Sequence, residues 1–352
     1  MDSSSKSPRG RGVPDNPASR FASTFSERFE DYDPTEDPAP RTQFIPDSSA
    51  TIINYNDSPD IPFDASINVY RGCEHGCAYC YARPTHEYLG FSPGLDFESK
   101  IVVKYNAPEL LRKELSSPKW KPQTIAMSGV TDCYQPAERR LQLTRRVLEV
   151  LLEFRNPVGI VTKNHLVTRD VDLLAELARF NCAAVYVSIT TLDAELTPKL
   201  EPRASLPNLR LAAIRKLHEA GVPVGVMAAP MIPGLNDHEL PQILSAAADA
   251  GARSAGLVPV RLPFAVKDIF ADWLGRHFPD RKEKVLNRIR SLRGGQLNNA
   301  EFGSRMTGEG VWAEQLRQMF DVMVRKLGLN ENEAELSTAH FRRPGGEQIR
   351  LW

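Results

Sequence analysis

Six short apolar runs alternate with amphipathic segments along the middle of the chain. The runs have the length of buried strands and occupy residues 66–71, 124–128, 158–162, 184–190, 222–228 and 255–260. Hydrophobic positions in the intervening segments are spaced as on one helix face, at residues 107–115, 141–154, 171–180, 208–220 and 237–250. This alternation predicts β-α-β units and a parallel sheet. Six units are too few for a closed eight-stranded barrel, so we expect an α/β fold with a partial (β/α)6 barrel of the TIM type.

The segments on either side of this core have a different composition. Residues 1–48 are rich in Ser, Pro and charged side chains and have few aliphatic ones, so we expect most of this segment to be disordered. The core itself is expected to cover residues 64–260. Residues 261–352 are predicted to form a helical extension that ends in a tail. Because the tail retains bulky apolar residues, we expect it to be an ordered strap.

Charge and hydropathy narrow the classes of function. The 352 residues contain 44 Lys and Arg and 44 Asp and Glu, so no global field attracts nucleic acid or a membrane. No apolar run approaches the roughly 20 residues of a membrane span, and the N-terminus lacks the apolar part of a signal peptide. We therefore expect a cytoplasmic protein. The segment 276–293 carries seven Lys and Arg against two acidic residues, which fits either a solvated helix face or a local nucleic-acid contact.

Three cysteines, Cys73, Cys77 and Cys80, follow the first predicted strand with the spacing Cys-x3-Cys-x2-Cys. A [4Fe–4S] cluster normally takes four Cys ligands, and with no fourth Cys nearby one iron would stay open to another ligand. His75 would complete a Cys3His zinc site, but ligands this close together would strain a tetrahedron. A disulfide framework does not fit a chain with five Cys and no secretion signal.

The spacing, with Tyr79 before the third Cys and Tyr81-Ala82-Arg83 after it, resembles the cluster loop of the radical SAM superfamily. The resemblance implies a [4Fe–4S] cluster on Cys73, Cys77 and Cys80, with S-adenosylmethionine (SAM) at the open iron. It further implies that SAM is cleaved reductively to a 5′-deoxyadenosyl radical, which abstracts hydrogen from a substrate that the sequence does not identify. A reductant protein of the flavodoxin or ferredoxin type would supply the electron.

Chemistry in a parallel barrel lies at the carboxyl ends of the strands, so the residues that follow each strand are the candidates for binding SAM. Small and hydroxyl side chains follow the second strand, a lysine follows the third, and hydroxyls end the fourth. A loop that resembles the adenine-contacting loop of the family follows the fifth. With the aromatic residue of the cluster loop, the candidates are Tyr79, Ser128, Gly129, Thr131, Lys163, Ser188, Thr190 and Asn236.

Within the superfamily, the steps Tyr79-Cys80-Tyr81, Thr131-Asp132 and Thr162-Lys163 resemble the spore photoproduct lyase branch. A later segment resembles uncharacterised bacterial relatives of that branch. The lyase reverses a thymine dimer and uses a Cys as hydrogen donor where this chain has Val130. Tyr81 and Cys133 are the catalytic candidates, Cys133 as a thiol displaced along the loop.

Three functions follow from these observations. The first is a radical SAM enzyme of unknown substrate, with nucleic acid left open as that substrate. The second is a DNA-repair photoproduct lyase. The third is a non-catalytic module that binds zinc or a cluster and recognises nucleic acid.

Overall fold

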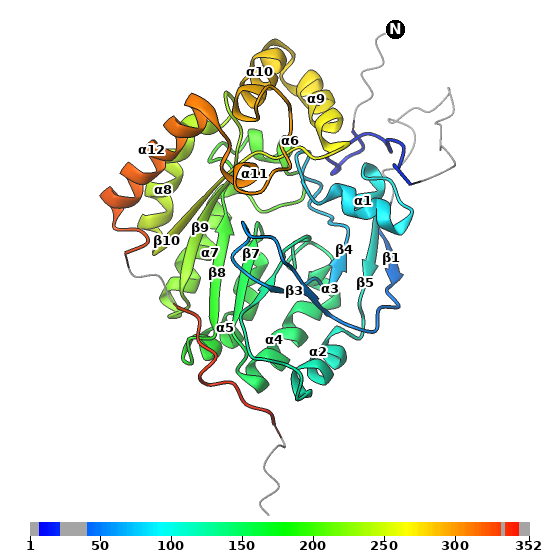
Figure 1. Ribbon diagram of the computed structural model, residues 1–352, viewed down its shortest axis with the longest axis vertical. Helices are drawn as coiled ribbons and strands as arrows, with labels where there is room; N and C mark the ends of the chain where they lie inside the picture. Colours follow the sequence, from blue (N-terminus) through cyan, green and yellow to red (C-terminus); the bar gives the residue numbers. More distant parts are fainter. Residues whose placement is uncertain (1–6, 22–40, 332–334, 345–352) are drawn as a thin grey trace, which may run out of the picture.

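The main sheet is an open, mostly parallel sheet of the kind that the sequence predicts. The computed structural model describes residues 7–21, 41–331 and 335–344. Seven strands lie in the order β10-β9-β8-β7-β6-β3-β2, and all neighbouring pairs are parallel except the antiparallel edge pair β2 and β3. The six parallel strands confirm the partial (β/α)6 barrel (Figure 1). The bounds are β2 (Ile53–Tyr55), β3 (Ala65–Ile67), β6 (Ile125–Met127), β7 (Val158–Thr162), β8 (Ala183–Ser188), β9 (Val224–Met231) and β10 (Ser254–Pro259).

Helices connect the parallel strands and cover the outside of the barrel. The predicted helices are confirmed within a few residues, except that the one predicted over 141–154 is divided at Gln142, whose backbone is left-handed with φ 51°. The helices of the core are η1 (Arg83–Leu89), α1 (Leu95–Ser99), α2 (Ala107–Ser116), α3 (Glu138–Leu141), α4 (Leu143–Phe154), η2 (His165–Asp170), α5 (Val171–Ala178), α6 (Leu196–Leu200), α7 (Pro207–Glu219), η3 (Asp237–Glu239) and α8 (Leu240–Asp249).

The first predicted strand is shorter than expected. The run over 66–71 divides into β3 and β4 (Tyr70–Arg71), and β4 belongs to a second sheet, ordered β1-β5-β4, with β1 (Gln43–Pro46) and β5 (Lys100–Val103). Asn68 lies at the division, and its side-chain oxygen accepts hydrogen bonds from the backbone N–H groups of Val130 (3.0 Å) and Thr131 (3.3 Å). The chain therefore leaves the barrel sheet where Asn68 binds the loop after β6.

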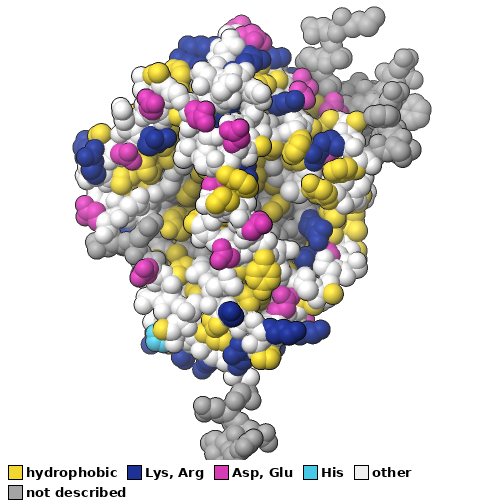
Figure 2. All heavy atoms as spheres, viewed as in Figure 1, with side chains coloured by type: hydrophobic (Ala, Val, Ile, Leu, Met, Phe, Trp, Pro, Cys, Tyr) yellow, Lys and Arg dark blue, Asp and Glu magenta, His cyan; other side chains and the backbone are white. Residues whose placement is uncertain are grey.

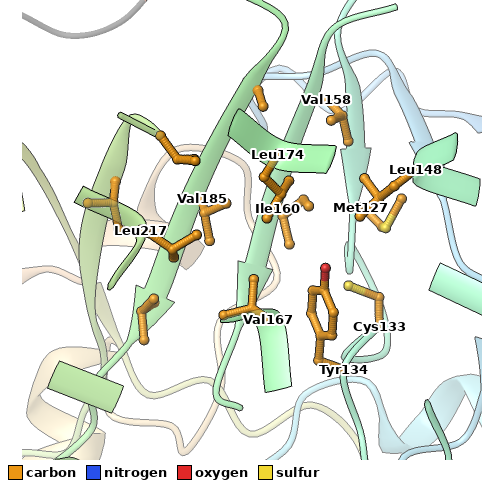
Figure 3. Close-up of a cluster of buried hydrophobic side chains, with 14 of the residues drawn as sticks. Met127, Cys133, Tyr134, Leu148, Val158, Ile160, Val167, Leu174, Val185 and Leu217 are labelled. Carbon is orange, nitrogen blue, oxygen red and sulfur yellow. The ribbon is translucent and has the colours of Figure 1, made fainter. Parts of the chain in front are cut away.

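The hydrophobic core lies between the sheet and its helices. Val158 and Ile160 of β7 and Val185 of β8 face Leu174 of α5 and Leu217 of α7, and all five are fully buried (Figure 3). Burial of each such side chain stabilises the fold by about 1.5–3 kcal/mol. The core thus holds the strands in register and fixes the positions of the loops at their carboxyl ends.

Part of the N-terminal segment has a defined position. Residues 7–21 lie beside α1 (Figure 1), and β1 pairs with β5 in parallel. Arg11 and Val13 are buried, so this polar stretch is packed against the core. Residues 1–6 and 22–40 lie outside the described residues.

The C-terminal extension is mostly helical, as predicted. It contains α9 (Val266–His277), η4 (Pro279–Arg281), α10 (Lys282–Leu292), α11 (Ser304–Thr307) and α12 (Gly310–Leu327), and α12 packs along α8 (Figure 1). In the described part of the tail, Ser337 N–H donates to Asn181 O (2.8 Å) and Arg342 N–H donates to Phe154 O (2.9 Å). Residues 335–344 therefore dock on the core as the expected strap.

Candidate functional site

The loop that carries the three cysteines is fixed by backbone hydrogen bonds at both ends. Cys73 N–H donates to Phe97 O of α1 (2.9 Å), and Ala78 N–H donates to Leu200 O of α6 (3.1 Å). Cys73 and Cys77 are buried, and Cys80 is partly exposed. The loop therefore holds all three thiols at buried or partly buried positions.

Arg83 is fully buried and binds the backbone of this loop. Its guanidinium donates twice to Cys77 O (3.0 and 2.9 Å) and pairs with Glu98 of α1 at 2.5 Å. Burial raises the pKa of Glu98, although Arg83 opposes that shift. The carbonyl of Cys77 is thus held by a fixed cation whose counter-ion lies in the next helix.

The three thiols are close enough to influence one another. Burial is the largest cause that raises the pKa of Cys73, and Asp132, Cys77 and Cys80 raise it further. Burial also raises the pKa of Cys77 and of Cys80, while Arg83 lowers that of Cys80. A set of donors made only of sulfur suits an iron–sulfur cluster or another thiophilic metal. The residues present therefore fit a [4Fe–4S] cluster with three protein ligands.

His75 is buried in the same loop, but its ring nitrogens contact residues of other loops. Its Nε2 lies 3.1 Å from the amide nitrogen of Asn164, and its Nδ1 lies 3.4 Å from a carboxylate oxygen of Asp132. Burial lowers the pKa of His75. Both ring nitrogens thus face the loops after β6 and β7. Both nitrogens of His75 therefore have partners other than the three thiols, which disfavours a Cys3His zinc site.

A buried polar network joins the cluster loop to the ends of β7 and β8. The Lys163 ammonium donates to Ala229 O (3.0 Å) and to the Thr190 hydroxyl (3.4 Å), and it lies 3.5 Å from a Glu201 carboxylate oxygen. The hydroxyl groups of Tyr79 and Thr190 both donate to that carboxylate. Lys163, Thr190 and Tyr79, proposed separately from the sequence, therefore share one partner.

Glu201 is the centre of this network, and the sequence analysis did not identify it. Burial by itself would raise the pKa of Glu201, but Arg210 and Lys163 hold it well below its usual range. Arg210 is equally buried, pairs with Glu201, and donates to Ser188 O (3.0 Å) and Ser205 O (2.8 Å). This ion pair fixes the end of β8. Its two members are far from the cysteines in sequence, so no local spacing could have indicated them.

Several polar groups of the loop after β6 form hydrogen bonds within the protein. Ser128 has a left-handed backbone (φ 77°), and its hydroxyl accepts from Cys133 N–H (2.9 Å). The Thr131 hydroxyl donates to Tyr70 O (2.7 Å). Gly129 O accepts from the Tyr81 hydroxyl (2.7 Å), which links this loop to the cluster loop. The structure therefore places Ser128, Gly129 and Thr131 in one loop that Gly129 joins to the cluster loop.

Ser188 and Asn236 also lie at the carboxyl ends of strands. Ser188 ends β8 and is buried. The Asn236 amide donates to Thr190 O (2.6 Å) and Pro230 O (3.1 Å), and its oxygen accepts from Ile232 N–H (2.6 Å). Because the whole amide is used inside the protein, we expect Asn236 to shape the loop around a ligand instead of contacting it directly.

Cys133, a catalytic candidate of the sequence analysis, lies in the interior of the protein. It is 2% exposed and belongs to the main hydrophobic core, where it lies beside Met127 and Tyr134 (Figure 3). Burial raises the pKa of its thiol well above the usual value. Cys133 therefore has the environment of a small buried hydrophobic residue. Val130, by contrast, is 36% exposed.

Tyr81, the other catalytic candidate, is 47% exposed and adjoins Cys80. Arg261, which follows β10, lies over its ring with the guanidinium carbon 5.5 Å from the ring centre. Burial raises the pKa of Tyr81 to about 12. A phenol at this place is available to a substrate, and Arg261 is a second residue that the sequence analysis did not identify.

The basic stretch 276–293 is only partly a solvated surface. Arg293 is 2% exposed and donates to Val260 O (2.7 Å) and Ser304 O (3.0 Å), and Arg276 donates to the Ser7 hydroxyl (2.5 Å). Cationic and acidic side chains are interspersed on the face drawn in Figure 2. Two of the seven cations therefore hold the extension on the core. Across the described ranges, no helix has the length and apolar character needed to cross a membrane.

Comparisons with known proteins agree with this geometry. A family model described as the radical SAM superfamily matches residues 67–247. An uncharacterized protein of Mycobacterium tuberculosis is 40% identical over 234 residues, which are 66% of this chain and 68% of the relative. An uncharacterized protein of Methanocaldococcus jannaschii is 34% identical over 173 residues, or 49% of this chain and 62% of the relative.

Among solved structures, spore photoproduct lyase in complex with dinucleoside spore photoproduct has a similar fold. The TM-score is 0.56 with 17% sequence identity, and the match covers 81% of this chain and 80% of the lyase. A mutant of the same lyase gives a TM-score of 0.57 at the same identity and coverage. At this identity the likeness concerns the fold.

Proposed function

This chain belongs to the radical SAM superfamily, and we propose that it is an enzyme that binds one [4Fe–4S] cluster through Cys73, Cys77 and Cys80. When bound, the cluster supplies the electron that cleaves SAM to methionine and a 5′-deoxyadenosyl radical, which abstracts hydrogen from the substrate. The observation that carries the proposal is the set of three sulfur donors held on one loop at the barrel mouth, while the other two cysteines lie in the core.

The other site residues have separate roles in the proposal. Lys163 and Ser188 bind the methionyl end of SAM, because a carboxylate needs donors at the ends of β7 and β8. Thr190 and Tyr79 hold Lys163 in place through Glu201. Tyr81 faces the substrate as the catalytic candidate. Buried surroundings of low polarity strengthen each of these electrostatic contacts and exclude water from the site.

Metal analysis tests the proposal against the zinc alternative. After anaerobic reconstitution with iron and sulfide, we expect about four iron atoms and matching sulfide per chain. About one zinc ion per chain, with no uptake of iron, would support the non-catalytic zinc module instead. The buried contacts of both His75 ring nitrogens favour the cluster.

Lys163→Ala is expected to weaken SAM binding by about tenfold to a hundredfold, because a charge-assisted hydrogen bond contributes about 1.5–3 kcal/mol. The measurement is equilibrium binding of SAM to the reconstituted protein, with iron content determined in the same sample. Lys121→Ala, at an exposed position, is the matched control and should leave the affinity unchanged. If Lys163→Ala binds SAM as the wild type does, the assignment of Lys163 fails.

A DNA-repair lyase remains the second candidate because the fold is similar to that enzyme over most of both chains. Two residues disfavour it. Val130 offers no S–H to return a hydrogen to a substrate radical, and Cys133 is enclosed in the core. We therefore propose a substrate other than a thymine dimer, with a flavodoxin- or ferredoxin-type protein as reductant. The cytoplasm is the proposed compartment, since it keeps the five cysteines reduced.

A further inference from the structure

The segment 7–21 lies outside the residues that match the family model, yet it contacts the cluster loop. It runs beside α1 (Figure 1) and contains neither helix nor strand. Arg11 is 7% exposed and Val13 is 1% exposed. A polar stretch that is buried without regular structure must have its backbone groups paired elsewhere. The partners of this segment therefore indicate what it does.

One line of buried hydrogen bonds leads from this segment to a cluster ligand. Gly12 N–H donates to one carboxylate oxygen of Glu98 (2.9 Å), and the other oxygen pairs with Arg83 at 2.5 Å. Arg83 in turn donates to Cys77 O. Gly12 thus donates a hydrogen bond to Glu98. Glu98 is the counter-ion of Arg83, and Arg83 binds the carbonyl of Cys77.

Two glycines of this region provide room for close backbone contact. A Cβ atom on Gly12 would lie 1.7 Å from Gly76 O, inside the cluster loop. A Cβ atom on Gly94 would lie 2.2 Å from Asp15 O, which accepts from Leu95 N–H (2.9 Å). Gly94 O is also an acceptor for Arg83 (2.9 Å). The segment is therefore packed against the cluster loop at Gly76 and against the start of α1 at Gly94.

A second line of contacts reaches the loop through Glu74. The Thr42 hydroxyl donates to Glu74 (2.5 Å) and accepts from Arg11 (3.2 Å). Arg203 pairs with the same carboxylate at 2.9 Å, and its N–H donates to His75 O (3.2 Å). Arg11 thereby joins the segment to the half of the loop that lies between Cys73 and Cys77.

We infer that residues 7–21 form an N-terminal clamp that fixes the cluster loop from outside, with Gly12 as its positioning residue. The clamp holds Cys73 and Cys77 in place before any metal binds and covers the outer face of the loop against water and small molecules. Its effect on the bound cluster rests on the proposed function. Its effect on the loop does not, because the contacts exist in the protein alone.

Hydrogen exchange in the metal-free full chain tests the clamp. Gly12→Ala should displace the clamp, because the methyl group would collide with Gly76 O. We expect the Ala78 and Cys80 amides to exchange about tenfold faster than in the wild type, while amides of β8 keep their rates. Arg9→Ala is the matched control, because Arg9 lies in the same segment and its side chain is exposed. A chain that lacks residues 1–21 should show the same change as Gly12→Ala.

Unchanged loop exchange in both Gly12→Ala and the truncated chain would overturn the inference. So would an equal acceleration in β8, which would indicate general destabilisation, or an equal effect of Arg9→Ala. In reconstituted protein, the same two variants should release iron to a chelator about tenfold faster than the wild type. If the wild type takes up no iron, the proposed function fails, whereas faster loop exchange in Gly12→Ala would still support the clamp.

Discussion

Replacement of any one of Cys73, Cys77 and Cys80 by Ala is expected to abolish the brown absorbance of the reconstituted protein and to remove nearly all of its iron. The three thiols are the whole set of sulfur donors at the barrel mouth, since Cys133 and Cys182 are enclosed in the core. Loss of one ligand leaves two, too few to retain a cluster that normally has four. Iron and sulfide analysis with the visible spectrum is the measurement.

His75→Ala is the matched control for these variants, because it alters the same loop without removing a sulfur. Its iron content should stay close to that of the wild type. Retention of iron in a Cys77→Ala protein would contradict the assignment of the ligands. Loss of the metal in the His75→Ala protein would instead favour the zinc interpretation.

Glu201→Gln is expected to destabilise the metal-free protein by about 3–5 kcal/mol, because it leaves the buried cation of Arg210 without a counter-ion. Both side chains are 1% exposed. Urea unfolding followed by circular dichroism measures the effect. Glu176→Gln is the control: it breaks an exposed pair with Arg179 (3.0 Å) and should cost less than about 1 kcal/mol.

The effect of Glu201→Gln should depend on pH. The folded-state pKa of Glu201 lies below the ordinary value of 4.5 that applies in the unfolded chain. Its stabilisation is therefore fully present above that value and is lost as the pH falls through the folded pKa. The difference in unfolding free energy between the wild type and Glu201→Gln should become smaller at acidic pH. A destabilisation at pH 7 no larger than that of Glu176→Gln would show that the pair does not support the end of β8.

The parallel strands could be predicted because burial on both faces leaves continuous apolar runs in the sequence. The division of the first run could not, because it depends on a tertiary contact of Asn68 with the loop after β6. The position of residues 7–21 could not be predicted from the sequence either. Their composition is mostly polar, and backbone and charged contacts to Glu98 and Glu87 hold them in addition to the buried side chain of Val13.

Some residues of the candidate site could likewise be predicted from the sequence, and others could not. The ligand loop is local in sequence, so its spacing alone indicated the three cysteines. Lys163 and Thr190 could be found from the rule that residues at strand ends face the barrel mouth. Glu201 follows α6 and Arg210 lies in α7, where no motif marks them, and only the fold brings them to Tyr79. The burial of Cys133 depends on tertiary packing that the sequence does not show.

The most direct test of the central claim is the amount of 5′-deoxyadenosine formed when the anaerobically reconstituted protein is given SAM and dithionite. The account predicts that the wild type forms 5′-deoxyadenosine and that Cys80→Ala, treated identically, forms none. A wild-type protein that contains its full complement of iron and sulfide, yet leaves SAM intact under these conditions, would contradict it.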